Sequence, residues 1–130
     1  MTTTELTAES FEQTVLDNDI VLVDWWASWC GPCRMFGPIF EKASATYPDI
    51  VFGKVDTEAE QSLATAAQIT SIPTLMAFRE GILVFSQPGA LPAASLEQVI
   101  ARVRELDMDD LRVQTAESQA GESQAASATS

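Results

Sequence analysis

The 130-residue sequence contains no histidine, and only seven basic residues stand against 19 acidic ones. The absence of histidine excludes Cys–His and Ser–His–Asp catalysis, and it excludes every metal site that needs an imidazole ligand. The formal net charge of −12 argues against a nucleic-acid or anionic-membrane surface, because both require clustered lysine and arginine. Apolar residues make up 46% of the chain, so its length fits one compact domain with a hydrophobic core.

Long hydrophobic runs and secretory features are also missing. Residues 1–10 show neither the basic region nor the apolar region of a signal peptide, and no stretch approaches the ~18 apolar residues of a membrane span. We therefore expect a soluble, cytoplasmic protein. Only two cysteines occur, Cys30 and Cys33, and a pair so close together suits chemistry better than it suits stabilisation of the fold.

The composition changes near residue 106. Residues 1–106 carry the apolar patterns of a folded domain, whereas after Val113 the only apolar side chains are alanines among Ser, Gln, Thr and Glu. Such a stretch cannot bury enough surface to offset its ordering entropy. We expect residues 107–130 to form a disordered acidic tail, which serves solubility rather than regulation.

The body alternates strand and helix patterns. Expected strands are residues 2–6, Ile20–Trp26, Val51–Asp56, Thr74–Arg79 and 83–87, with a tight turn at Glu80-Gly81 between the last two. Expected helices are residues 8–17 capped by Thr7, a helix after Cys30 bent at Pro38, residues 60–67, and a helix starting near Pro92. This order predicts an α/β fold whose mixed sheet has helices on both faces.

The Cys30-Gly31-Pro32-Cys33 segment follows an expected strand and opens an expected helix. Unpaired amide groups and the helix dipole favour negative charge there, so the pKa of Cys30 should fall. Cys33 lies one turn further along, from where it can attack a mixed disulfide on Cys30. The alternative is half of a zinc site, but zinc needs four ligands and the chain has two cysteines and no histidine.

Asp24 interrupts the apolar run of its strand, where a bare carboxylate is costly to bury. One interpretation is a desolvated carboxyl with a raised pKa that exchanges protons with Cys33. The other is an exposed strand end or a structural ion pair. Lys54, in the neighbouring expected strand, either tunes Asp24 or is a surface charge without a role. We expect Trp25 and Trp26 in the core and Trp29 on the surface in contact with substrate.

Taken together, these motifs resemble thioredoxin. The segment from Val23 to Cys33, reading VDWWASWCGPC, matches the active-site stretch of that family, and Pro38, Lys54-Val55-Asp56, Ile72-Pro73-Thr74, Gly81 and Gly89-Ala90 fall at its spacings. The match covers about residues 2–106. It implies the thioredoxin fold, a five-stranded mixed sheet flanked by four helices.

The resemblance also implies roles for individual residues. Cys30 would attack, Cys33 would resolve and Asp24 would carry the proton. Pro73 would be cis and face the cysteines, although a proline before a strand is by itself ordinarily trans, since cis accounts for only ~5–6% of X–Pro bonds. A docking groove would be formed by Trp29, Gly31, Pro32, Ile72, Gly89 and Ala90, while Lys54, Gly31, Pro32 and Pro73 would modulate the cysteines.

The family pattern further implies partners. An NADPH-dependent flavoprotein thioredoxin reductase would restore the dithiol as an external partner, so no cofactor or metal would be bound beyond the redox-active disulfide Cys30–Cys33. Gly31-Pro32 matches the reducing members, whereas oxidising relatives commonly have histidine there. We expect a monomeric reductant of protein disulfides. A non-catalytic binding module that uses the same surface is the alternative.

Overall fold

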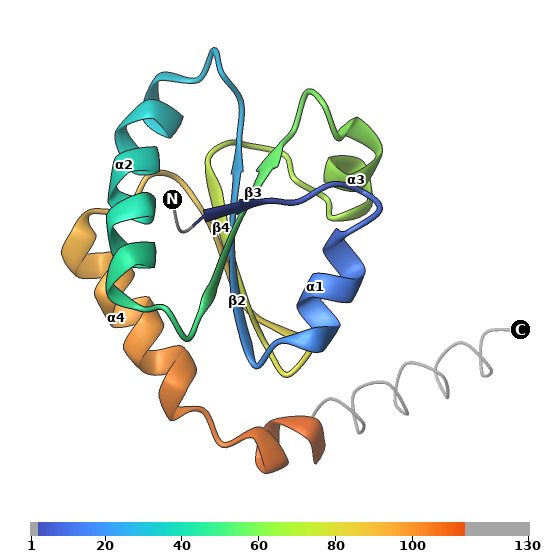
Figure 1. Cartoon of the computed structure of the whole chain (residues 1–130), viewed down its shortest axis with the longest axis vertical. Coiled ribbons are helices and arrows are strands. Elements are labelled where there is room, and N and C mark those ends of the chain that lie inside the picture. The colour runs from blue at the N-terminus through green and yellow to red at the C-terminus, as the bar shows by residue number, and fades with distance from the viewer. Residues whose placement is uncertain (1–2, 114–130) are drawn as a thin grey trace, which may run out of the picture.

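The computed structural model of the chain describes residues 3–113 and shows one five-stranded sheet with helices on both sides (Figure 1). The strands are β1 (Thr3–Glu5), β2 (Ile20–Trp26), β3 (Val51–Asp56), β4 (Thr74–Arg79) and β5 (Ile82–Pro88). The helices are α1 (Phe11–Asp17), α2 (Gly31–Thr46), α3 (Gln61–Ala66) and α4 (Ala93–Glu105). A short helical segment, residues 108–113, follows α4.

The sheet is mixed, with the strand order β1-β3-β2-β4-β5. β3 runs parallel to both β1 and β2, while β4 is antiparallel to β2 and to β5. Within this register Trp26 aligns with Asp56, and Trp25 aligns with Thr74. The loops that follow β2 and precede β4 therefore leave the sheet at the same edge.

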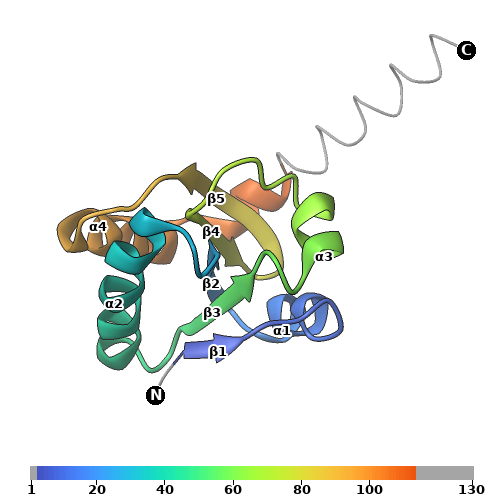
Figure 2. The same ribbon diagram turned by 90° about the horizontal axis from the view of Figure 1, so that it is seen from above.

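The central strand β2 is apolar because helices cover both of its faces (Figure 2). Val21, Val23 and Trp25 pack with residues of α1 and α3 on one side. Leu22 points to the other side, where it joins the apolar residues of α2 and α4. The alternation along β2 also directs Asp24 toward the side of α2 and α4, because side chains two positions apart share a face.

The core between the sheet and the pair α2 and α4 contains three phenylalanines. The ring centroid of Phe40 lies 5.8 Å from that of Phe36 and 5.1 Å from that of Phe52. Burial of one such side chain contributes about 2–3 kcal/mol. This packing fixes the axis of α2 against the sheet, and with it the position of the cysteines in the first turn of α2.

The expected elements are present, with local differences. α1 begins at Phe11 rather than at residue 8, because residues 8–10 form a turn. In that turn Thr7 accepts hydrogen bonds from the backbone N–H groups of Ser10 and Phe11. α2 continues through Pro38 as one helix. The turn at Glu80-Gly81 is confirmed, and both residues have positive φ, of 51° and 81°.

The segment predicted to be a tail begins with ordered structure. Residues 108–113 are helical, because Met108 is buried and Arg112 forms an ion pair with Glu80 of the β4–β5 turn. Asp107 caps this segment by accepting a hydrogen bond from the Asp110 N–H. The sequence led us to expect disorder from residue 107 onward, whereas residues 108–113 are helical here. The remainder of the predicted tail, residues 114–130, lies outside the described residues.

Candidate active site

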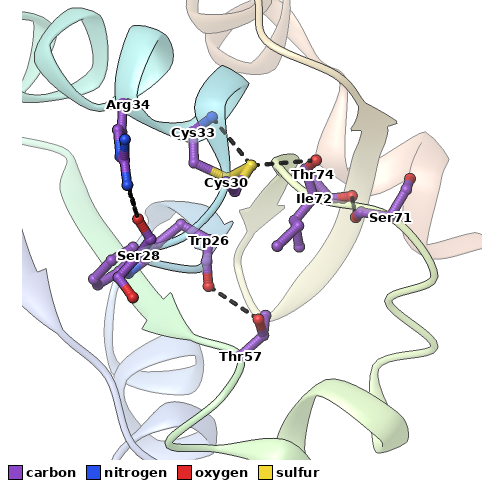
Figure 3. The surroundings of a disulfide bond; sticks show 9 residues. All are labelled: Trp26, Ser28, Cys30, Cys33, Arg34, Thr57, Ser71, Ile72 and Thr74. Atoms are coloured by element: carbon purple, nitrogen blue, oxygen red, sulfur yellow. Dashed lines mark hydrogen bonds between the residues drawn. A yellow bond between two sulfur atoms is a disulfide. The ribbon is translucent and has the colours of Figure 1, made fainter.

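The two cysteines lie at the start of α2, at the edge of the sheet where β2 ends. Cys30 is the N-cap residue, with extended backbone, and Gly31 is the first residue of the helix. The two cysteines form a disulfide, and their Cα atoms are 5.2 Å apart. The Cys33 N–H donates to Cys30 Sγ at 3.2 Å (Figure 3). The sulfur of Cys30 therefore occupies the capping position that the sequence predicted, where the helix dipole favours an anion.

Side-chain hydrogen bonds that the sequence did not predict hold the loop between β2 and α2. Both Nε and Nη2 of Arg34 donate to the Ser28 carbonyl oxygen, at 3.2 and 2.9 Å (Figure 3). The Thr57 N–H and hydroxyl donate to the Trp26 carbonyl oxygen, at 2.9 and 3.0 Å. The Trp26–Thr57 contact has no local sequence signal, because it spans 31 residues of sequence.

The loop before β4 lies beside the disulfide. The Ile72–Pro73 peptide bond is cis, as the resemblance implied, and Pro73 is buried. The Ile72 carbonyl oxygen lies 3.7 Å from Cys30 Sγ (Figure 3). The Gly89 N–H donates to the Pro73 carbonyl oxygen at 2.7 Å, which brings the exposed Gly89 and Ala90 to the same region. The structure thus gathers around the cysteines the residues predicted to form a groove.

Exposure around the disulfide differs sharply from residue to residue. Cys30 and Cys33 are 4% and 5% exposed, whereas the adjacent Trp29 is 63% exposed. Gly31 and Pro32 are also exposed. Trp29 is therefore a surface side chain, as predicted, and it stands beside the redox pair.

The prediction that Trp25 and Trp26 belong to the core is confirmed for Trp25 only. Trp25 is fully buried, but Trp26 is partly exposed, and the Lys54 ammonium lies 5.1 Å from its ring centroid. Trp26 is the last residue of β2, and it lines the same cavity as Lys54 and Glu41. Trp26 also contacts the buried group formed by Ala27, Cys30 and Cys33.

Asp24 is a buried carboxyl in β2. It has no exposed surface, and neither carboxyl oxygen has a hydrogen-bond partner in the described residues. Desolvation by burial raises the pKa of Asp24 from 3.8 to about 7, and the charge of Lys54 lowers it in part. The interpretation as an exposed strand end or an ion pair is therefore wrong.

Lys54 lies directly across from Asp24 in the register of β2 and β3. Its side chain is 19% exposed, and its ammonium lies 3.9 Å from Glu41 Oε1 of α2. A shallow cavity of about 250 Å³ adjoins these groups, and Cys33, Arg34, Gly37 and Trp26 also line it. Lys54 is thus a partly buried charge next to the site rather than a surface charge.

Comparison with known proteins identifies the family. The thioredoxin family model matches residues 2–102. The chain is 61% identical over 118 residues to the Streptomyces coelicolor protein named "Putative thioredoxin 2". This alignment covers 91% of this chain and 88% of that relative. The chain belongs to the thioredoxin family. It is also similar to the Porphyra purpurea thioredoxin, at 41% identity over 77% of this chain and 95% of the relative.

Solved thioredoxin structures share the fold. A mutant thioredoxin from Halobacterium salinarum superposes with a TM-score of 0.74 at 32% identity, covering 79% of this chain and 91% of that one. Plasmodium falciparum thioredoxin gives a TM-score of 0.71 at 34% identity, with 76% of this chain and 97% of that one covered. With its Cys30–Cys33 pair at disulfide distance, this thioredoxin-family chain is a protein thiol–disulfide oxidoreductase, and its substrates contain disulfides.

Among residues 3–113, no group of three or more His, Cys, Asp or Glu side chains is placed to hold a metal ion. In the same range, no helix has the length and apolar character needed to cross a bilayer.

Proposed function

We propose that the chain reduces protein disulfides, with Cys30 as the attacking thiol. In the dithiol form, the Cys30 thiolate attacks one sulfur of the client disulfide and forms a mixed disulfide, while the second client sulfur leaves as a thiolate and takes up a proton. The observation that supports this assignment is the N-cap position of Cys30, whose Sγ accepts the Cys33 N–H. That donor and the helix dipole favour negative charge on Cys30.

Cys33 resolves the mixed disulfide in the second step. Its thiol gives a proton to the Asp24 carboxylate, its sulfur attacks Cys30 Sγ, and the client sulfur bound to Cys30 leaves. The client gains two electrons, and Cys30–Cys33 becomes oxidised. A base for this step needs a pKa near the working pH, and burial places the pKa of Asp24 at about 7. Asp24 is accordingly the proposed proton acceptor.

The client segment binds in an extended conformation along the loop of the cis-proline. Ile72 offers its backbone to such a segment, in the manner of a strand added to a sheet edge. The Gly89 N–H donates to the Pro73 carbonyl oxygen, and this hydrogen bond joins the two loops that form the groove. Trp29, 63% exposed, supplies an apolar contact, as do Gly31, Pro32 and Ala90 beside it.

The cycle closes through an external reductase. We propose that an NADPH-dependent flavoprotein thioredoxin reductase returns two electrons to the disulfide, so that this chain needs no bound cofactor and acts as a monomer. Gly31 and Pro32 carry no ionisable group that would further favour the reduced state of the pair, which supports a reductant rather than an oxidant. A reductant works where disulfides are kept reduced, and this supports a cytoplasmic location.

Insulin reduction tests the proposal. The parent protein should catalyse reduction of insulin disulfides with dithiothreitol as the electron source, and the Cys30→Ser variant should be inactive. The Cys33→Ser variant should accumulate a mixed disulfide through Cys30, which non-reducing electrophoresis and mass spectrometry detect. Full activity of Cys30→Ser would refute the assignment of the attacking thiol. Equilibration with glutathione redox buffers would then show whether the pair donates or accepts electrons.

A further inference from the structure

Glu41 is a charged residue near the site to which the mechanism assigns no role. It lies on α2 eight residues after Cys33, and its side chain is 50% exposed. Its Oε1 is 3.9 Å from Lys54 Nζ, and both residues line the cavity of about 250 Å³ beside Cys33. The Glu41–Lys54 pair therefore lies on the solvent side of the proposed proton acceptor.

Lys54 lies near the buried carboxyl of Asp24 and the half-exposed carboxylate of Glu41, and Glu5 of β1 aligns with it on the other side of β3. Its position in β3 aligns with Asp24 in β2, and Lys54 shares a sheet face with Phe52, which packs toward α2. In the described residues, however, the only ion pair of Lys54 is with Glu41. The Trp26 ring, 5.1 Å from the ammonium, also lies against it. Lys54 is thus held by Glu41 and Trp26 and makes no ion pair with Asp24.

We propose that Glu41 is a positioning residue, which holds the Lys54 ammonium away from Asp24 and so keeps Asp24 able to accept a proton near neutral pH. This inference rests on the proposed role of Asp24. If Glu41 loses its charge, Lys54 loses the carboxylate that holds its ammonium away from Asp24, and the ammonium moves closer to Asp24. A closer ammonium stabilises the ionised form of Asp24, and the carboxylate then becomes a weaker base for Cys33.

The other charged groups near this face do not replace Lys54. The elements on the Asp24 side carry Glu5 on β1, Lys54 and Asp56 on β3, Cys33, Arg34, Glu41 and Lys42 on α2, and Glu97, Arg102, Arg104 and Glu105 on α4. Of these, Lys54 is the charge that shifts the pKa of Asp24. Arg34 is occupied by the Ser28 carbonyl oxygen. An effect of Glu41 on Asp24 must therefore pass through Lys54.

The experiment titrates Asp24 directly in the oxidised protein, in which Cys30 and Cys33 form the disulfide. The full chain is labelled with ¹³C at the aspartate carboxyl carbon, and the NMR shift of Asp24 is followed against pH. In the Glu41→Gln variant, the pH midpoint of the Asp24 titration should fall by about 0.2–0.5 pH units, which is the size expected for loss of a half-exposed ion pair. The matched control Glu105→Gln removes an exposed acid from α4 and should leave the midpoint within about 0.1 pH of the parent value.

A double-mutant cycle separates positioning from a direct effect of the charge. Lys54→Met should raise the midpoint of Asp24, and Glu41→Gln added to Lys54→Met should produce no further shift. Glu41→Asp, which keeps the charge, should restore a midpoint closer to that of the parent. An unchanged or raised Asp24 midpoint in the Glu41→Gln variant would overturn the proposal. The proposal would also be overturned if Glu41→Gln shifted the midpoint equally in the parent and in the Lys54→Met variant. These titrations need no activity, so their outcome is independent of insulin reduction.

Discussion

Replacing Asp24 with asparagine should stabilise the folded protein at neutral and alkaline pH. The folded-state pKa of about 7 lies above the ordinary value of 3.8, so between these values the folded protein holds a proton that the unfolded chain has released. The free energy of unfolding then falls as pH rises through this window and levels off above it. The full difference between the two pKa values corresponds to a loss of about 4 kcal/mol in the free energy of unfolding.

Urea unfolding of the oxidised protein at pH 5 and at pH 8 measures this loss. Asparagine cannot ionise, so the stability of Asp24→Asn relative to the parent should increase by about 2–3 kcal/mol between these two pH values. The change with pH is more informative than the difference at one pH, because the cost of burying an uncharged amide is the same at both. A parent and a variant with equal pH dependence would refute the burial argument.

The same variant should be slower in catalysis although it is more stable. Without a base at position 24, the resolving attack of Cys33 on the mixed disulfide should slow by about tenfold or more near neutral pH. Stopped-flow mixing of the reduced protein with a client disulfide gives the rate of this step. A variant that is more stable and equally fast would show that Asp24 is buried but does not accept the proton.

Three further outcomes follow from single side chains. Trp29→Ala should change stability by less than about 0.5 kcal/mol, since the indole is 63% exposed, yet raise the KM for insulin several-fold. Gly53→Ala should cost about 1–3 kcal/mol in urea unfolding, because a Cβ atom there overlaps the Leu6 side chain. Arg79→Met should lower stability by about 1–3 kcal/mol, because Nη1 of Arg79 donates to two carbonyl oxygens at the end of α4; equal stability of parent and variant would contradict this.

Short-range patterns in the sequence were enough to predict the main features of the fold. The apolar run of β2 indicated a strand covered on both faces, and Glu80-Gly81 indicated the hairpin. Element ends were less predictable, because they depend on contacts between distant residues. α1, for example, starts at Phe11 after a turn in which the Ala8 N–H bonds to Glu60, 52 residues away.

The candidate site was predictable where its residues are adjacent in sequence. The capping position of Cys30 follows from a strand, a short loop and a helix, and the burial of Asp24 follows from its apolar neighbours. The contacts of Arg34 with Ser28 and of Lys54 with Glu41 were not predicted, since long charged side chains have many possible partners within reach. The resemblance to the family, rather than local physics, predicted the cis bond at Pro73.

The ion pair between Arg112 and Glu80 holds the last described residues of the chain beside the β4–β5 turn. Glu80 follows Arg79, which aligns with Ile20 at the start of β2, whereas Cys30 follows the end of that seven-residue strand. The two ends of such a strand are roughly 20 Å apart. A bead, electrode or fusion partner joined directly after Val113 would therefore lie near the opposite end of the strands from the cysteines. Large client proteins could then still reach Cys30 and Cys33.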